Sequence, residues 1–234
     1  MKILCCICGR GGSKEVPNKN IKIFLGKPLI LYTIEQAKDS KIFDKIVLSS
    51  DSEKILRLGK KKKLDLLIKR PKNLSSGQVQ KLSAIKHLFK TSENFFKAKF
   101  DLIVDLDITA PLRTISDIKK SIEIIKRKSF PSNLVNITPS RRNPYFNMVK
   151  IKNKKVKLLI SKKRKIHARQ TAPKVFDLDP AVYVWNRQGL LNCKNVLNRN
   201  TYFNIIPNYR SHDIDSLLDF KIVEYHHKLN RSKF

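Results

Sequence analysis

A glycine-rich stretch near the amino end, CGRGGSKEVPNKN (residues 8–20), follows directly on a short apolar run. Backbone amides at Gly11 and Gly12 carry no bulky side chains and can approach a polyphosphate, while Arg10 and Lys19 can neutralise part of its charge. The stretch contains neither the G-x-G-x-x-G pattern nor the Walker pattern. We therefore predict a phosphate-binding loop of another kind, with a glycine-rich turn that holds no ligand as the alternative.

A pair of carboxylates near the other end of the chain, Asp213 and Asp215, is separated by a single apolar residue. If the chain is extended there, both side chains face the same side. Mg²⁺ prefers oxygen ligands and usually keeps waters and substrate phosphates as its other ligands. The pair therefore predicts a magnesium site, although Asp215 also fits the N-cap of a closing helix.

The segments between these motifs alternate between apolar runs and amphipathic stretches, which predicts an α/β fold with a mostly parallel sheet covered by helices on both faces. In such sheets ligands bind beyond the carboxyl ends of the strands. The glycine loop, Asp51 and Asp107 all fall at such ends, so we expect one site there. The predicted strands are residues 3–7, 45–51, 64–68, 100–107 and 134–138, and the predicted helices begin near residues 28, 52, 79 and 115.

The alternation changes after about Pro139. YFNMVKIKNKKVKLLI (residues 145–160) predicts a β-hairpin with a lysine-rich turn, and the basic segment that follows is typical of a partner-contacting arm. The sheet resumes at residues 181–186 and 202–207. We therefore predict a single domain over residues 1–234, with a small inserted β-hairpin extension over residues 140–172 through which the chain dimerises.

The formal net charge of +31 is unusual for a chain of 234 residues and would attract nucleic acid or an anionic membrane. The basic residues are nevertheless spread along the chain, and no RNP-like aromatic motif, zinc-finger spacing or detached basic tail is present. We expect a solvated basic surface with no specific nucleic-acid or membrane partner. A protein that binds RNA or a membrane surface stays open as the alternative.

Three of the four cysteines, Cys5, Cys6 and Cys8, lie in or directly after the first predicted strand. Cys5 and Cys6 are adjacent there and point to opposite faces, so they cannot both bind one metal ion. Buried thiols in a reducing compartment are the better interpretation. No apolar run approaches the about 20 residues of a transmembrane helix, and the amino end does not read as a signal peptide. These features predict a cytoplasmic protein.

Four longer stretches resemble the CMP-sialic acid synthetase family, the acylneuraminate cytidylyltransferases. They are GRGGSKEVPNKNIKIFLGKPLILYTIEQA, LDITAPLRTISDI, DPAVYV and DIDSLLDFKIVE, and together they extend over nearly the whole chain. The family transfers CMP from CTP to a 2-keto sugar acid and releases pyrophosphate, with Mg²⁺ as cofactor. The resemblance implies that activity, a homodimer, and a Rossmann-like three-layer nucleotidyltransferase fold.

The resemblance also implies roles for individual residues. Those expected at the nucleotide are Arg10, Gly11, Gly12, Ser13, Lys14, Lys19, Asn20, Arg70 and Lys81. Those expected at the sugar are Asp107, Arg169, Gln170 and Tyr183. Asp213 and Asp215 are expected to hold the metal, and together with Arg10 and Lys19 they form the expected catalytic set, because preorganised charges would stabilise the departing pyrophosphate. Arg169 would pair with the sugar carboxylate.

Some positions depart from the sialic acid pattern. Asp107 stands where those enzymes carry glutamine, Lys81 replaces a small hydroxyl residue, and Glu15 replaces a glycine, which would repel a triphosphate unless it points away. The first two, with ARQTAPKVFDLDPAVYVW, resemble the branch that acts on legionaminic acid and related diamino sugars. The alternatives are activation of pseudaminic acid or an eight-carbon keto sugar acid, or a non-catalytic protein on this scaffold that binds RNA or a membrane surface.

Overall fold

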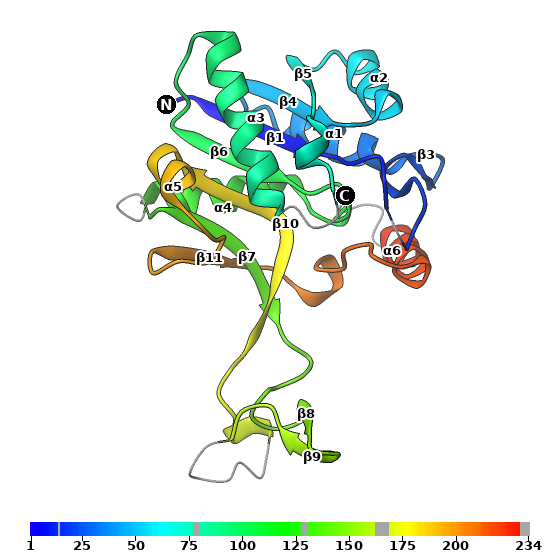
Figure 1. Ribbon diagram of the computed structural model, residues 1–234, viewed down its shortest axis with the longest axis vertical. Coiled ribbons are helices and arrows are strands. Elements are labelled where there is room, and N and C mark those ends of the chain that lie inside the picture. Colours follow the sequence, from blue (N-terminus) through cyan, green and yellow to red (C-terminus); the bar gives the residue numbers. More distant parts are fainter. Residues whose placement is uncertain (14, 77–79, 128–130, 162–168, 230–234) are drawn as a thin grey trace.

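The computed structural model describes residues 1–13, 15–76, 80–127, 131–161 and 169–229. Its centre is a seven-stranded sheet with the order β11-β7-β10-β6-β1-β4-β5 (Figure 1). The strands of this sheet, in chain order, are β1 (Ile3–Cys8), β4 (Lys45–Ser50), β5 (Leu66–Lys69), β6 (Leu102–Leu106), β7 (Asn133–Pro139), β10 (Phe176–Asn186) and β11 (Thr201–Ile205). The pairs β1–β4, β1–β6, β4–β5 and β7–β11 are parallel, whereas β10 runs antiparallel to β6 and β7.

The central strands are nearly continuous apolar runs because both faces of the sheet are covered. β1 reads ILCCIC and is almost entirely buried. Cys5 belongs to the core on one face of the sheet and Cys6 to the core on the other. This confirms that adjacent thiols of β1 point apart, as the sequence predicted.

Helices form a layer on each face, which confirms the predicted α/β class. One face is covered by α1 (Leu29–Ser40), α2 (Glu53–Lys61), α4 (Ile115–Arg127) and α6 (Leu217–Leu229). The other face is covered by α3 (Lys81–Phe96) and α5 (Arg187–Asn192). No helix in the described part of the chain is both long and apolar enough to cross a bilayer.

Short elements complete the connections between the layers. β2 (Ile23–Phe24) pairs with β3 (Lys27–Pro28) in a tight hairpin whose Gly26 has a φ of 92°, in the region that favours glycine. The single-turn 3₁₀ helices are η1 (Lys19–Ile21), η2 (Lys72–Leu74), η3 (Arg169–Thr171) and η4 (Asn208–Arg210).

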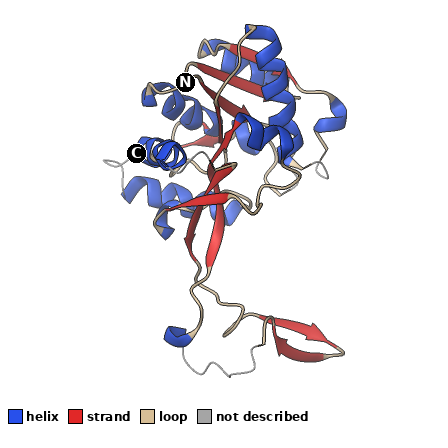
Figure 2. Cartoon of the chain, turned by 90° about the vertical axis from the view of Figure 1, so that its left-hand side faces the viewer, coloured by secondary structure: helices blue, strands red, loops and turns tan. Residues whose placement is uncertain are grey.

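Residues 140–161 and 169–175, which lie between β7 and β10 in the chain, form an arm that projects from the body of the molecule (Figures 1 and 2). The arm contains the antiparallel hairpin of β8 (Val149–Lys152) and β9 (Lys155–Leu158), which confirms the predicted hairpin. Cross-strand partners are apolar on one face of the hairpin and lysines on the other, as in the pairs Ile151–Val156 and Lys150–Lys157. All eight strand residues are exposed, so the apolar face has no cover within the described chain.

Candidate active site

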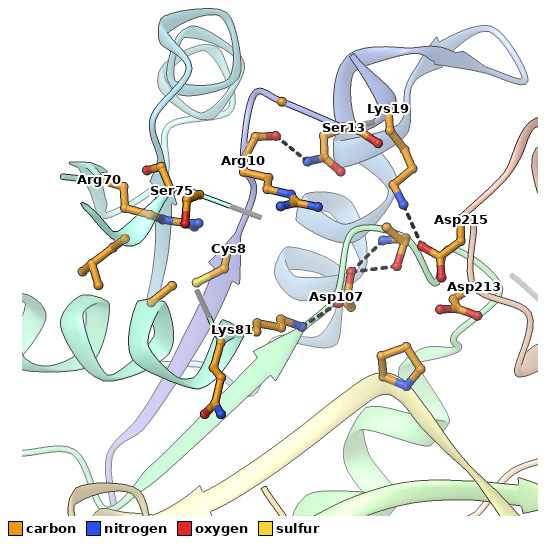
Figure 3. A pocket seen from close by; sticks show the side chains of 18 residues that line it. Cys8, Arg10, Ser13, Lys19, Arg70, Ser75, Lys81, Asp107, Asp213 and Asp215 are labelled. Atoms are coloured by element: carbon orange, nitrogen blue, oxygen red, sulfur yellow. Dashed lines mark hydrogen bonds and ion pairs between the residues drawn. The ribbon is translucent and has the colours of Figure 1, made fainter. Parts of the chain in front are cut away.

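An open cleft of about 320 Å³ lies at the carboxyl ends of β1 and β6 (Figure 3). The glycine loop, the start of α3, the turn after β6 and the segment before α6 all contribute side chains to it. The cleft therefore lies where the parallel strands predicted a ligand site. Its size falls within the range of small-molecule sites in proteins.

The glycine loop supplies Arg10, Gly12 and Ser13 to this cleft. Gly11 has a different part: its amide donates to Asp51 Oδ1 at 2.7 Å. A Cβ at Gly11 would lie 2.9 Å from Ser52 Cβ, so a glycine is needed there for close packing of the loop against the segment after β4.

Two further loop residues bear on the phosphate-site prediction. Lys14, which the resemblance places at the triphosphate, lies outside the described residues. Glu15 is exposed and is not among the residues that line the cleft.

Lys19 joins the two ends of the chain at the cleft. It sits in η1, and its Nζ donates to the carbonyl oxygen of Ile214 at 2.5 Å and to Asp215 Oδ1 at 3.0 Å (Figure 3). The amide of Ile214 in turn donates to the carbonyl of Thr109 at 2.9 Å, which ties the acid pair to the turn after β6. Cations from the amino end and acids from the carboxyl end thus share one cleft.

Asp213 and Asp215 both line the cleft, and their arrangement fits a magnesium ion. Burial, and next the neighbouring charge of Asp215, raise the pKa of Asp213. A divalent cation would relieve this unfavourable proximity of two carboxylates. No group of three or more histidine, cysteine, aspartate or glutamate side chains suited to a metal occurs within the described chain. The ion would therefore take its remaining ligands from water and phosphate.

The N-cap alternative for Asp215 is wrong. Helix α6 begins at Leu217, and Ser216 makes the reciprocal bonds of a capping box with Asp219: Ser216 N donates to Asp219 Oδ2 at 2.7 Å, and Asp219 N donates to Ser216 Oγ at 3.1 Å. Asp215, whose side chain is 70% exposed, is thereby left to face the cleft.

The end of the cleft opposite the acid pair is formed by Arg70 and the segment that follows it. The Arg70 guanidinium is buried and donates through Nη2 to the carbonyl of Ser49 at 2.8 Å, which fixes its orientation. Asn20 also lines the cleft, and its Nδ2 donates to the carbonyl of Arg10 at 2.9 Å. Sequence reasoning missed the other lining residues at this end, which are Cys8, Leu74, Ser75, Ser76, Gln80 and Ala84.

Lys81 forms an ion cluster with two acids at the end of β6. Its Nζ lies 2.5 Å from Asp105 Oδ2 and 2.6 Å from Asp107 Oδ2. Burial alone would lower the pKa of Lys81, but the two carboxylates reverse this effect and raise it, so the ammonium stays charged. Burial would raise the pKa of Asp107, yet Lys81 and Thr109 lower it to about 2. Two of the three departures noted in the sequence, Lys81 and Asp107, are therefore bonded to each other.

Arg113 is buried and does not line the cleft, but it forms hydrogen bonds to several elements around it. Its Nη1 donates to the carbonyls of Asp107 at 3.0 Å and Ala181 at 2.6 Å, and its Nη2 donates to Thr33 Oγ1 at 3.1 Å and Gln36 Oε1 at 2.9 Å. One side chain thus links the turn after β6, strand β10 and helix α1.

Asp179 lies at an irregularity in β10, beside the cleft-lining Pro180. Its Oδ1 accepts a bond from the amide of Ala181 at 2.8 Å, while Oδ2 has no hydrogen-bond partner among the described residues. Burial, with a further contribution from Asp213, raises the pKa of Asp179 to about 7.

The residues expected at the sugar do not come together in one chain. Asp107 lines the cleft. Tyr183 is buried in the core, and Lys81 Nζ lies 5.9 Å from the centre of its ring. Arg169 and Gln170 lie in η3 on the projecting arm, away from the cleft of the same chain.

Sequence reasoning missed Asp105 and Arg113. Asp51, which it placed at the site, accepts the bond from the amide of Gly11 and does not line the cleft. A signal existed only for Asp105, because it lies two residues before Asp107 in a strand and must share its face. The partners of Arg113 are distant in the sequence, so no local pattern pointed to it.

Comparison with known proteins agrees with this geometry. The profile of a family described as cytidylyltransferase matches residues 4–206. A CMP-N,N′-diacetyllegionaminic acid synthase of Campylobacter jejuni is 42% identical over 224 residues, which cover 96% of this chain and 94% of that protein. Post-translational flagellin modification protein B of Campylobacter coli is 41% identical over 224 residues, with coverage of 96% and 94%.

More distant similarity extends to other enzymes and to solved structures. A pseudaminic acid cytidylyltransferase of Campylobacter jejuni is 32% identical, over 98% of each chain. A structure of CMP:2-keto-3-deoxy-manno-octonic acid synthetase complexed with CTP has a TM-score of 0.71 at 12% identity and covers 98% of this chain and 99% of its own. This similarity confirms the Rossmann-like three-layer nucleotidyltransferase fold.

Proposed function

The chain belongs to the cytidylyltransferase family, and we propose that it transfers CMP from CTP to the anomeric hydroxyl of a sialic-acid-like nonulosonic acid, with release of pyrophosphate. Legionaminic acid or a close relative is the proposed acceptor, since the C. jejuni relative at 42% identity is a CMP-N,N′-diacetyllegionaminic acid synthase. The observation that carries the proposal is the meeting of Lys19 with Asp213 and Asp215 in one cleft.

The transfer needs positioning and charge more than it needs a covalent intermediate. The oxygen of the anomeric hydroxyl forms a bond to the α-phosphorus, the bond from that phosphorus to the oxygen bridging it to the β-phosphate breaks, and the hydroxyl proton leaves to water. Arg10 and Lys19 are proposed to stabilise the pyrophosphate as its charge develops, with Ser13 donating a hydrogen bond. Lys14 is proposed at the same phosphates.

Asp213 and Asp215 are proposed to hold Mg²⁺. The ion would supply positive charge at the phosphate oxygens during the transfer. Lys19, which bonds to Asp215 and to the carbonyl of Ile214, would keep the acid pair in position beside the phosphates.

The cytidine is proposed to lie at the other end of the cleft, with Asn20 and Arg70 at its base. Arg70 suits this role because its contact with the carbonyl of Ser49 fixes the guanidinium before the ligand arrives. The acceptor sugar is proposed to lie beside Asp107, with Tyr183 supporting that region from the core.

A homodimer is proposed, formed through the arm over residues 140–172. The support is the uncovered apolar face of its hairpin, where Ile151 is 79% exposed and Val156 is 67% exposed. Arg169 and Gln170 lie on the same arm, and we propose that they reach the acceptor in the cleft of the partner subunit. The four cysteines are all free thiols, which supports a cytoplasmic location for the enzyme.

The experiment is a pyrophosphate-release assay with CTP, Mg²⁺ and a panel of keto sugar acids. The panel contains N,N′-diacetyllegionaminic acid, pseudaminic acid, N-acetylneuraminic acid and an eight-carbon keto sugar acid. The proposal predicts the highest kcat/KM for the legionaminic acid. A preference for pseudaminic acid would assign the enzyme to the activity of the relative at 32% identity instead.

A further inference from the structure

The ion cluster of Lys81, Asp105 and Asp107 is a rigid, built feature of the cleft floor. Asp105 and Asp107 lie on the same face of the chain at the end of β6, and Lys81 is the first residue of α3. Figure 3 shows the Lys81 side chain pointing at Asp107 across the floor of the cleft. A cluster that joins a strand end to a helix start has little freedom to reorganise.

The three charges depend on one another. The Asp105 side chain is 0% exposed, and no group in the described chain other than Lys81 forms an ion pair with it. Losing the cation would leave a buried, unpaired carboxylate. Asp107 is held on its other oxygen by the amide and the hydroxyl of Thr109, both at 2.9 Å. Asp105 and Thr109 thus fix the orientation of the Lys81–Asp107 pair.

The Lys81–Asp107 pair presents a hydrogen-bond donor and, beside it, a hydrogen-bond acceptor to the cleft. An ammonium has three N–H donors, and the close contacts of Lys81 with Asp105 and Asp107 leave at least one of them for a ligand. The Lys81 side chain is 34% exposed and lines the cleft, and the Asp107 side chain is 16% exposed beside it. A hydroxyl both donates and accepts, so hydroxyls match this pair better than a carbonyl or a phosphate does.

The position of the cluster along the cleft indicates which hydroxyls these are. Figure 3 shows Lys81 and Asp107 between Arg70, at one end of the cleft, and Asp213 and Asp215, at the other. The cluster therefore lies between the Arg70 end and the acid pair, which is where the ribose of a nucleotide lies when its base is at Arg70 and its phosphates are near Lys19.

We propose that Lys81, positioned by Asp105 and Asp107, is a specificity-determining residue that binds the ribose hydroxyls of the nucleotide. The ammonium donates to a ribose hydroxyl oxygen, and the Asp107 carboxylate accepts from a ribose hydroxyl. The inference rests on the proposed function in one respect, namely that a cytidine nucleotide occupies this cleft.

The test compares the binding of CTP with that of 2′,3′-dideoxy-CTP, by titration calorimetry in Mg²⁺ and without any acceptor sugar. Hydrogen bonds that involve charged groups predict that the wild-type protein binds CTP roughly 10- to 100-fold more tightly than the dideoxy analogue. The double variant Lys81→Met/Asp105→Asn removes the ammonium without leaving Asp105 charged and buried. In this variant the ratio of the CTP affinity to the dideoxy-CTP affinity should fall close to one, while the affinity for dideoxy-CTP is retained. The matched control Lys90→Met, an exposed lysine of the same helix, should keep the wild-type ratio.

If the double variant does not fold, Asp107→Asn provides a second test, and this variant should lower the ratio of the two affinities at least several-fold. A wild-type ratio near one, or an unchanged ratio in the folded variants, overturns the inference. Because no acceptor sugar is present, the outcome of this binding test is independent of the turnover assay that tests the proposed function. Discrimination without turnover on any sugar would contradict only the proposed function, and turnover without discrimination would contradict only the role of Lys81.

Discussion

At the scale of single residues, the central feature of the site is the contact between Lys19 and Asp215. A lysine from the amino end and an aspartate from the carboxyl end lie 3.0 Å apart, although 196 positions separate them in the chain. Lys19 is well shielded and Asp215 is exposed, so the pair is open to ligands on the aspartate side. This asymmetry suits an acid that accepts a metal ion while a lysine behind it sets its orientation.

Replacing Asp215 by asparagine keeps the size of the side chain but removes its charge. We predict that kcat falls by roughly 10³-fold, because a metal ion supplies several kcal/mol of transition-state stabilisation. The unfolding free energy should change little, since the side chain is exposed. The pyrophosphate-release rate checks the first expectation and urea unfolding the second.

Asp39→Asn is the matched control for this change, because Asp39 is an exposed aspartate of α1 outside the cleft. It should leave both quantities unchanged. Near-normal turnover in Asp215→Asn would contradict a metal-binding role for Asp215.

The buried Asp179 predicts a pH dependence of stability. Its pKa, raised from 3.8 to about 7, means that the folded protein holds this proton more tightly than the unfolded chain does. The stabilising contribution of Asp179 is therefore complete below about pH 4 and is lost as the pH rises through about 7. Relative to the wild type, Asp179→Asn should gain unfolding free energy between these pH values, at about 1.4 kcal/mol per pH unit at most.

Urea unfolding of both proteins from pH 4 to pH 8, in the absence of nucleotide and with a metal chelator, measures this difference. Parallel pH profiles for the wild type and Asp179→Asn would show that Asp179 titrates in its ordinary range when the protein is folded.

At the scale of elements, Arg113 couples the turn after β6 to β10 and α1. Two backbone carbonyls and two side-chain oxygens accept bonds from its guanidinium, which is 1% exposed. Strand β10 carries Pro180 and Asp179, so this side chain also sets where β10 lies relative to Asp107. The shape of the cleft therefore depends on a residue that does not line it.

Substituting Arg113 by methionine should lower the unfolding free energy by roughly 3 kcal/mol or more, since several buried acceptors lose their donor. Arg113→Lys should recover little of this, because an ammonium lacks the planar, forked geometry of a guanidinium. Denaturant unfolding at neutral pH checks both variants.

Arg127→Met is the control, because Arg127 is an exposed residue of α4 whose ion pair with Glu123 is a surface contact. It should change stability by less than about 1 kcal/mol. A similar loss of unfolding free energy in Arg113→Met and Arg127→Met would contradict the role of Arg113 in linking these elements.

The elements also show what the sequence can predict. The alternation of apolar strands and amphipathic helices fixed the layers, and the parallel order brought Arg10, Lys19 and Asp107 to one edge. The Lys81–Asp105 pair could not be predicted, since it depends on where α3 begins relative to β6. The N-cap prediction for Asp215 was wrong because Ser216 and Asp219 form a competing capping pair. The register shift in β10 between Asp179 and Tyr183 also could not be predicted, since no local pattern signals it.

At the scale of the whole molecule, the arm and the surface charge suggest how the chain meets other molecules. The hairpin of the arm separates apolar side chains from lysines by face, and two strands alone are marginally stable in water. A second subunit that covers the apolar face would stabilise the arm. The net charge of +31 that each subunit carries would then lie on solvent-facing surfaces of the proposed dimer.

Placing a charge on the apolar face should break the proposed dimer. We predict that Ile151→Asp converts a wild-type dimer into a monomer, because the aspartate would be buried against an apolar partner surface. Lys152→Ser, on the opposite face of the same strand, should remain dimeric. Sedimentation velocity at several protein concentrations measures the mass, and a monomeric wild type or a dimeric Ile151→Asp would contradict assembly through this face.

The most direct test of the account combines CTP, Mg²⁺ and N,N′-diacetyllegionaminic acid with the wild-type protein and quantifies the products by mass spectrometry. We predict a CMP-sugar and pyrophosphate in equal amounts, with formation abolished by a metal chelator. Unchanged CTP with every sugar acid of the panel, together with salt-sensitive RNA binding, would contradict it and identify the cleft as part of a non-catalytic basic protein.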